Sequence, residues 1–197
     1  MSAREEILSS VRRALGPAER ATEPVPDGYR SAAFDGDVVD LFVERVTDYR
    51  AVVTRCAPSE VPSRIRSALG SAERVLVPEG LRFDVPDAEP DRGLTATELD
   101  EFDAVVTEAS VGIANTGTIV LEHGQGQGRR ALSLVPDLHV CVVRESQVVF
   151  GVPDAVALLD PGRPQTWISG PSATSDIELN RVEGVHGPRT LHVLVVR

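Results

Sequence analysis

The apolar residues of the first fifteen positions recur at helical spacing. Ser2 and Glu5 match the capping box that begins many helices, and a Gly-Pro pair stops the pattern after residue 15. The segment that follows, residues 16–37, is rich in Pro, Gly and Asp and has no periodicity, which is typical of a linker or mobile loop. The chain is therefore expected to consist of an N-terminal helix with its linker, residues 1–37, and one domain, residues 38–197.

After the linker, short apolar runs alternate with helical patterns. Helices are predicted over residues 38–49, 59–70 and 153–159, with a short helix or turn over 129–134 and a helix beginning at Ser172. Strands are predicted over residues 51–55, 74–77, 104–107, 140–143, 148–150, 165–169 and 191–196, and residues 111–122 are expected to form two extended stretches joined by a tight reversal. Short apolar strands separated by helices are typical of βαβ units, so we expect an α/β fold with a mainly parallel sheet.

Composition restricts the class of protein. With 197 residues, 42% of them hydrophobic, the chain can bury a sizeable core, and it has no apolar run approaching the roughly 20 residues that span a bilayer. The N-terminus carries acidic residues and lacks the apolar core of a signal peptide, so a cytoplasmic location without a membrane span is expected. A net charge of −10 without a basic stripe argues against nucleic acid as a partner.

Three residue types restrict the chemistry that this chain can carry. All 20 basic side chains are arginine, so neither a Schiff-base lysine nor a P-loop lysine is present. The two cysteines, Cys56 and Cys141, are too few for an iron–sulfur cluster, and Cys141 lies in an apolar run where a buried thiol is expected. None of the four histidines has the spacing of metal ligands, so no metal site is expected in this chain.

The first candidate site is a segment near the C-terminus that contains two Gly-Pro pairs. A ligand loop there would use Ser169, Gly170, Ser172, Thr174, Ser175 and Asp176, together with Gly187 of the second pair. Ser172 or Thr174 would cap the predicted helix, and helix N-termini beyond the carboxyl ends of strands bind anions in open α/β sheets. The alternative is a well-capped connection between a strand and a helix that binds nothing.

The second candidate is the polar reversal within residues 111–122. Asn115, Thr116, Gly117 and Thr118 present an amide, two hydroxyls and open backbone beside two apolar strands. They would form a wall of the same pocket. A simple hairpin is the alternative.

The third candidate is a loop of alternating Gly and Gln, residues 124–128, which precedes Arg129 and Arg130. Its spacing is not that of a dinucleotide or P-loop motif. It is expected to be either a mobile lid that brings Arg129 or Arg130 onto an anion, or a solvated flexible loop.

Two residues are candidates for acid–base or nucleophilic chemistry. His186 lies in a turn whose glycines let the backbone approach a ligand, and Glu108 directly follows the predicted strand 104–107, where active-site residues of α/β folds often lie. His139 and His192 each open an apolar strand and are expected to be structural.

Three motifs together resemble the LUD-domain family. They are IANTGTIVL at residues 113–121, RRALSLVPDLHVCVV at 129–143 and ISGPSATSDIELNRVEGVHGPRTLHVLVV at 168–196. The resemblance covers residues 38–197 and implies a three-layer, Rossmann-like fold similar to the NagB/RpiA/CoA-transferase group. The chain departs from the family pattern at Asn115, where an acid is common, and at Ala173, where a basic or polar residue is frequent.

The resemblance also implies a function. Members of the family resemble subunits of a bacterial three-component system that oxidises L-lactate to pyruvate, in which other subunits carry the iron–sulfur clusters. This chain would be the small cluster-free subunit of such an oxidoreductase complex, with no cofactor of its own, and would bind the carboxylate substrate or another small anionic metabolite.

Two alternatives remain. One is a free-standing enzyme on a CoA ester, sugar phosphate or folate-like ligand, with Glu108 as nucleophile or base. The other is an assembly subunit without catalysis that docks through its N-terminal helix.

Overall fold

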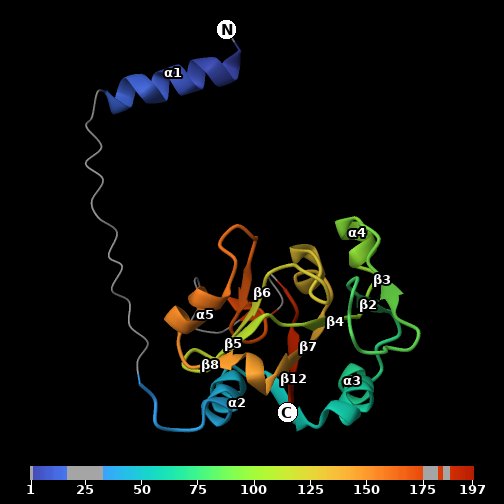
Figure 1. Cartoon of the computed structure of the whole chain (residues 1–197). Helices are drawn as coiled ribbons and strands as arrows, with labels where there is room; N and C mark the ends of the chain where they lie inside the picture. Colours follow the sequence, from blue (N-terminus) through green and yellow to red (C-terminus); the bar gives the residue numbers. More distant parts are fainter. Residues whose placement is uncertain (1, 17–32, 175–181, 184–186) are drawn as a thin grey trace.

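A computed structural model describes residues 2–16, 33–174, 182–183 and 187–197 (Figure 1). Its first element is helix α1 (Ala3–Leu15), as the periodicity predicts. The predicted capping box is present, since the backbone N of Ser2 lies 2.7 Å from Glu5 Oε2 and the backbone N of Glu5 lies 3.3 Å from Ser2 Oγ. Helix α1 buries none of its residues. No helix in the described part of the chain is long and apolar enough to cross a membrane.

The domain is built on a six-stranded sheet in the order β1-β12-β7-β4-β2-β3. Its strands are β1 (Val52–Cys56), β2 (Val75–Val77), β3 (Glu89–Pro90), β4 (Ala104–Glu108), β7 (Leu138–Arg144) and β12 (Thr190–Val196). Every pair of neighbouring strands in this main sheet runs parallel. The predicted α/β fold with a mainly parallel sheet is confirmed.

A second sheet lies against one face of the main sheet, in the order β8-β5-β6-β9. It consists of β5 (Val111–Ile113), β6 (Thr118–Leu121), β8 (Val148–Val149) and β9 (Thr166–Ile168). Strands β5 and β6 pair antiparallel with Ile113 opposite Thr118, so the predicted tight reversal is confirmed. Gly117 in this reversal has φ 58°, a conformation that glycine adopts without steric cost.

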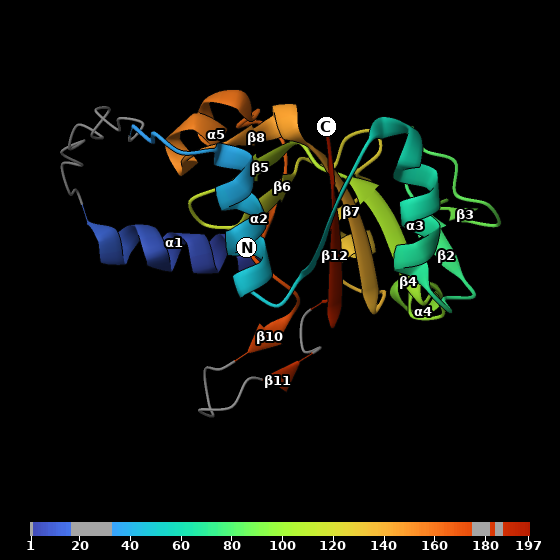
Figure 2. The same cartoon turned by 90° about the horizontal axis from the view of Figure 1, so that it is seen from below.

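Helices complete a three-layer arrangement. Helix α2 (Val38–Asp48) and the second sheet lie on one side of the main sheet, and helix α3 (Val61–Leu69) lies on the other (Figure 2). Because side chains alternate along a strand, β12 sends Val193 towards α2 and Leu194 towards α3. The remaining short elements are α4 (Ala96–Leu99), α5 (Val152–Leu158) and the 3₁₀ turns η1 (Pro58–Glu60), η2 (Arg130–Ser133) and η3 (Glu145–Gln147).

The prediction that a helix begins at Ser172 is wrong for the first residues of that segment. Ala173–Thr174 instead form strand β10, which pairs antiparallel with β11 (Val182–Glu183) in a separate two-stranded sheet. These two strands lie beyond the amino end of β12 (Figure 2). Ser and Thr side chains that cap helices also stabilise turns and extended backbone, and here the pairing with a later strand decides the conformation.

Candidate functional site

A pocket of about 290 Å³ opens at the amino ends of β7 and β12, beside β9 of the second sheet. Both Gly-Pro turns line it, so we name it the Gly-Pro pocket. Among the predicted ligand residues, its lining includes Arg130, Ser169, Gly170, Ser172 and Gly187. Residues far apart in the sequence are therefore gathered around one cavity.

The pocket lies at a different edge of the main sheet from the one that we expected. Ligands of open parallel sheets usually bind beyond the carboxyl ends of the strands, and the prediction of a ligand loop after residue 169 rests on that rule. The loop does follow the carboxyl end of β9. However, β9 belongs to the second sheet, so its end reaches the amino edge of the main sheet, where β7 and β12 begin.

Close contacts hold the first Gly-Pro turn against α2 and against the second turn. Gly170 has φ 79° and packs against the end of α2, where an added Cβ would come within 2.6 Å of Tyr49 Cβ. The backbone N–H of Ser172 donates to the carbonyl oxygen of Pro188 at 2.8 Å. A Cβ at Gly187 would lie 3.5 Å from the Cβ of Ser172. Glycine is therefore required at the first turn, and the second turn is held beside it.

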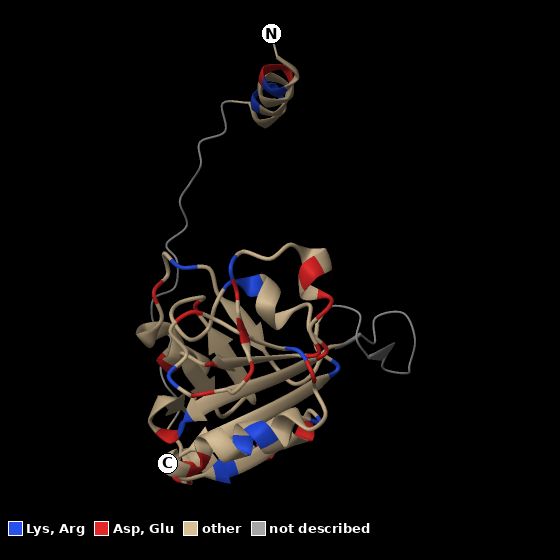
Figure 3. Cartoon of the chain, turned by 90° about the vertical axis from the view of Figure 1, so that its right-hand side faces the viewer, with Lys and Arg blue, Asp and Glu red and all other residues tan. Residues whose placement is uncertain are grey.

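Arg130 is the only permanently charged side chain among the described lining residues. It is exposed, and no ion pair among the described residues involves it. The chain as a whole carries a net charge of −10, and acidic and basic positions are interspersed along the ribbon in Figure 3. The described lining thus contains one guanidinium and no carboxylate, and this combination favours a small anion as ligand.

His139, the second residue of β7, forms part of the pocket lining although its side chain is only 1% exposed. Its Nε2 lies 2.8 Å from Thr107 Oγ1 on β4. Burial lowers the pKa of His139 from 6.5 to about 4, so the imidazole is neutral at neutral pH. The contact with Thr107 is the structural role predicted for this histidine, and His192 has the corresponding bond, with Nε2 2.9 Å from Thr54 Oγ1. The place of His139 in a pocket was not predicted, because no local motif indicates it.

The polar reversal between β5 and β6 supports the pocket wall through one residue. Thr118 Oγ1 lies 2.8 Å from Ser169 Oγ in the lining and 2.8 Å from Thr116 Oγ1 behind it. Gly117 packs on the backbone of α2, where an added Cβ would lie 2.7 Å from a carbonyl carbon, and Asn115 is exposed. Within the described structure, Thr118 is thus the residue of this reversal that hydrogen-bonds to the lining.

Arg129 serves a different site from its neighbour Arg130. Its Nε lies 2.7 Å from Asp91 Oδ2 and its Nη2 3.1 Å from Asp91 Oδ1. These hydrogen bonds are the main reason why the pKa of Asp91 lies below its ordinary value. Both residues border a separate, wider cleft of about 870 Å³.

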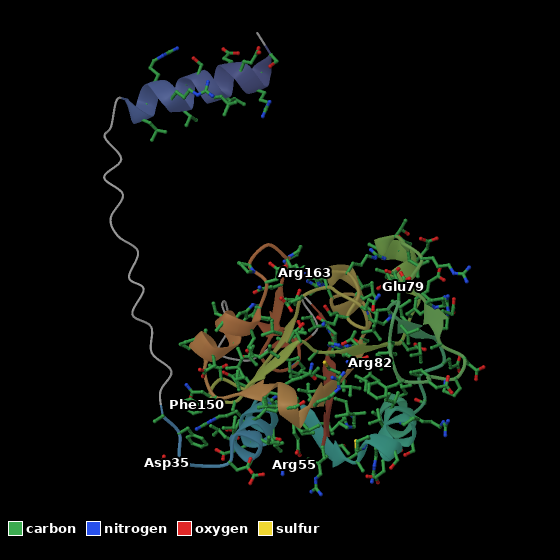
Figure 4. All side chains as sticks on the ribbon, viewed as in Figure 1. Asp35, Arg55, Glu79, Arg82, Phe150 and Arg163 are labelled. Atoms are coloured by element: carbon green, nitrogen blue, oxygen red, sulfur yellow. The ribbon has the colours of Figure 1, made fainter. Side chains whose placement is uncertain are left out.

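Glu108 ends β4 at the carboxyl edge of the main sheet and is only 4% exposed. Its carboxylate accepts from the backbone N of Arg82 at 3.1 Å, from the guanidinium of Arg82, and from Arg144 Nη2 at 3.1 Å (Arg82 is labelled in Figure 4). The carboxylate and Arg82 border a cleft of about 410 Å³. Neither arginine was predicted from the sequence. Arg82 lies in the loop after β2 and Arg144 ends β7, so the two are far apart in the chain and neither belongs to a local motif. With both oxygens engaged, Glu108 acts as a nucleophile only if these contacts open.

Hydrogen bonds anchor the glycine-rich loop, residues 124–128, across the same edge. The backbone N of Gly126 donates to Glu79 O at 2.8 Å, and the backbone N of Glu108 donates to Gly126 O at 2.7 Å. Gln127 Oε1 accepts the backbone N–H that follows β6 at 2.6 Å. A side chain at Gly126 would meet Glu108 Oε1 at 3.0 Å. The glycines therefore permit a close fit, where the sequence had indicated flexibility.

Several predicted site residues cannot be placed. Ser175, Asp176 and His186 lie outside the described residues, and Thr174 is described only as part of β10. Among the residues that the structure does describe, no group of three or more His, Cys, Asp and Glu side chains could hold a metal ion.

Comparison with known proteins identifies the family. The chain matches the LUD domain over residues 43–196. A protein of Deinococcus radiodurans named Lactate utilization protein C is 47% identical over 208 residues, which is 98% of this chain and 95% of that protein. An uncharacterized protein of Neisseria meningitidis, NMB1437, is 40% identical over 100 residues, or 48% of this chain and 42% of that protein. A crystal structure of a DUF162 family protein from Deinococcus radiodurans has 45% sequence identity and a TM-score of 0.70, and the match covers 81% of this chain and 96% of that one. The family match spans nearly the whole domain and a solved relative has the same fold, so the chain belongs to the LUD domain family.

Proposed function

We propose that this chain is the small, cluster-free subunit of a bacterial three-component system that oxidises L-lactate to pyruvate in the cytoplasm. Its similarity over nearly full length to a protein named Lactate utilization protein C supports the proposal. The iron–sulfur clusters would belong to partner subunits, because a cluster needs about four thiolates and this chain has two cysteines, both buried.

The Gly-Pro pocket is the proposed binding site for the carboxylate. Arg130 would pair with the carboxylate, the hydroxyls of Ser133 and Ser172 line the same space, and Leu134 and Leu191 supply apolar surface. The volume of about 290 Å³ lies at the lower limit of ligand pockets, which span about 300–1,000 Å³. One guanidinium in a small pocket is the observation that carries the proposal, because it fits a small anionic metabolite better than a bulky cofactor.

Binding of L-lactate to the full-length protein, measured by isothermal titration calorimetry, tests the pocket. Arg130→Gln should weaken binding about ten-fold to a hundred-fold, because a hydrogen bond to a charged group contributes about 1.5–3 kcal/mol. Arg92→Gln is the matched control, since Arg92 is an exposed arginine outside this lining and its loss should leave binding unchanged. Equal affinity of the wild type and the Arg130 variant would contradict the proposed site.

Growth tests the pathway separately from the pocket. A strain of the source bacterium that lacks this gene should not grow on L-lactate as sole carbon source but should grow normally on a sugar. The wild-type gene should restore growth on lactate, and the gene carrying Arg130→Gln should restore it less. Normal growth of the deletion strain on lactate would exclude the proposed pathway.

A second candidate function is a free-standing enzyme on a CoA ester, sugar phosphate or folate-like ligand. The observation that favours it is the buried carboxylate of Glu108 beside a cleft at the carboxyl edge of the main sheet. Such ligands would raise the melting temperature of the wild type but not of Glu108→Ala. If none of these ligands shifts the melting temperature of the wild type, this second function is wrong.

Helix α1 is the proposed contact with the partner subunits. Its apolar side chains are exposed, with Ile7 63%, Val11 49% and Leu15 55% accessible. Apolar residues on one helix face usually mark a surface that packs against another element. Deleting residues 1–20 should abolish co-purification with the iron–sulfur subunits, whereas retained binding would show that another surface makes the contact.

A further inference from the structure

His139 differs from the other polar side chains around the Gly-Pro pocket. Arg130 can only donate hydrogen bonds, and the serine hydroxyls can both donate and accept. A neutral imidazole has one donor and one acceptor nitrogen, and which is which depends on the partner of each. The side of the ring that meets a ligand therefore has a fixed polarity.

The contacts of Thr107 favour one polarity. Its Oγ1 lies 2.8 Å from His139 Nε2 and donates to Cys141 Sγ at 3.6 Å. A hydroxyl has a single hydrogen. With that hydrogen directed to the sulfur, the oxygen of Thr107 accepts from Nε2–H, and Nδ1 of His139 carries the lone pair. Among the described residues no hydrogen bond engages Nδ1.

Thr166, the one hydroxyl residue of β9, also lies in the lining, and its hydrogen is committed elsewhere. His123 Nδ1 lies 2.9 Å from the carbonyl oxygen of Gly128, which can only accept, so Nδ1 of His123 carries a hydrogen. In the tautomer with its hydrogen on Nδ1, the His123 ring accepts from Thr166 Oγ1 at Nε2, 2.9 Å away. The hydroxyl hydrogen of Thr166 is thereby used, so the oxygen of Thr166, like Nδ1 of His139, can only accept from a ligand.

We propose that His139 makes the Gly-Pro pocket selective for 2-hydroxy acids over 2-oxo acids. The inference rests on the proposed carboxylate site and names the substrate class that this site takes. Arg130 would hold the carboxylate, and Nδ1 of His139 would accept the hydrogen bond of the adjacent hydroxyl. A 2-oxo acid has no hydrogen to donate at that carbon, so its carbonyl oxygen would face a lone pair and leave a buried acceptor unpaired.

The rest of the lining is compatible with a short side chain on the same carbon. Leu134, Ile168 and Leu191 border the pocket and offer apolar contact to a methyl group. In this arrangement three substituents of one carbon meet three different surfaces: a guanidinium, an imidazole lone pair and aliphatic side chains. The reduced acid of a 2-hydroxy/2-oxo pair is the form that this arrangement binds.

The test compares three acids of similar size on the full-length protein by isothermal titration calorimetry at neutral pH. L-lactate should bind about 5- to 150-fold more tightly than pyruvate, the range expected when one buried hydrogen-bonding group is left unpaired. Propionate, which lacks any oxygen on that carbon, measures the contribution of the carboxylate alone. Equal binding of lactate and pyruvate, or tighter binding of pyruvate, overturns the inference, the latter because it would place the hydrogen on Nδ1.

Two substitutions of His139 distinguish the roles of its two ring nitrogens. The amide of a glutamine reaches the position of Nε2, so His139→Gln keeps a partner for Thr107 and removes the acceptor in the pocket. The amide oxygen of an asparagine reaches the position of Nδ1, so His139→Asn keeps the acceptor. The preference for lactate over pyruvate should be lost in the glutamine variant and kept in the asparagine variant. The reverse pattern, or a preference kept in both, overturns the inference.

The failure of this inference can be told apart from that of the proposed function. If all three acids bind with equal affinity and lose it together in Arg130→Gln, the carboxylate site stands and the selectivity is wrong. If none of the three binds the wild type, the carboxylate site is wrong and this inference falls with it. The comparison of the acids on the wild type needs no variant, so it stays decisive even if a substitution at His139 prevents folding.

Discussion

Acidification is expected to destabilise the domain through His139. The ring is buried beside the Gly-Pro pocket, where desolvation disfavours the imidazolium, and Thr107 is the described partner of its Nε2. The unfolded chain takes up a proton with the ordinary pKa of 6.5, whereas the folded chain does so only near pH 4. Between these two values the unfolded state binds more protons, so the free energy of unfolding falls as the pH falls. The contribution of His139 is fully present above about pH 6.5 and is lost progressively towards pH 4.

The size of the effect follows from the two pKa values. Because one pKa unit corresponds to about 1.4 kcal/mol, the fall from 6.5 to about 4 amounts to about 3 kcal/mol once both states are protonated. Of this, about 2 kcal/mol should be lost between pH 7.5 and pH 5. At an m-value of about 2 kcal/mol per molar urea, the unfolding midpoint should fall by about 1 M over that interval.

Urea unfolding of the wild type and of His139→Gln at a series of pH values isolates this contribution. Glutamine does not titrate, and the partly buried His192, whose pKa is also lowered by desolvation, is present in both proteins and cancels in the difference. The wild type should therefore lose stability more steeply than the variant between pH 7.5 and pH 5. Parallel pH profiles would refute the reasoning, as would an NMR titration in which the His139 ring protonates near pH 6.5.

Three further predictions concern other parts of the domain. Gly117→Ala should lower the free energy of unfolding by more than about 1 kcal/mol, because its φ is 58° and a Cβ would meet the backbone of α2 at 2.7 Å. Gly93→Ala has a similar φ of 84° but open space around the Cβ and should cost less. Equal denaturation midpoints for these two variants would contradict the packing argument. Glu108→Ala should destabilise by about 2 kcal/mol in urea unfolding, because it leaves two guanidiniums without their carboxylate, and an unchanged midpoint would show that the cluster contributes nothing. Cys56 and Cys141 should resist a thiol reagent at pH 8 until the protein is denatured, since burial raises both pKa values, that of Cys141 to about 12. Rapid labelling of the native protein would count against this.

The sequence pattern predicts where most strands and helices lie, but it does not predict which strands pair with each other. Apolar runs such as residues 104–107 and 140–143 indicated buried strands, and both lie in the centre of the parallel sheet. The run 118–121 is equally buried along its whole length, yet it belongs to the second sheet. A fully buried strand shows no alternation that distinguishes its two faces, so local pattern cannot assign it to a sheet. Strand partners are set by contacts between segments far apart in the chain.

Arg129 and Arg130 show the same limit at the site. They are adjacent, identical in chemistry and follow the same glycine-rich loop, so the sequence offers no reason to prefer one as an anion ligand. Asp91, 38 positions earlier in the chain, pairs with Arg129 and directs it into a different cleft. Arg130 begins η2, whose position is set by the strand that follows, and it is left beside the Gly-Pro turns. Sequence therefore identifies the chemistry that a site can use, whereas a distant ion pair decides which of two equivalent residues supplies it.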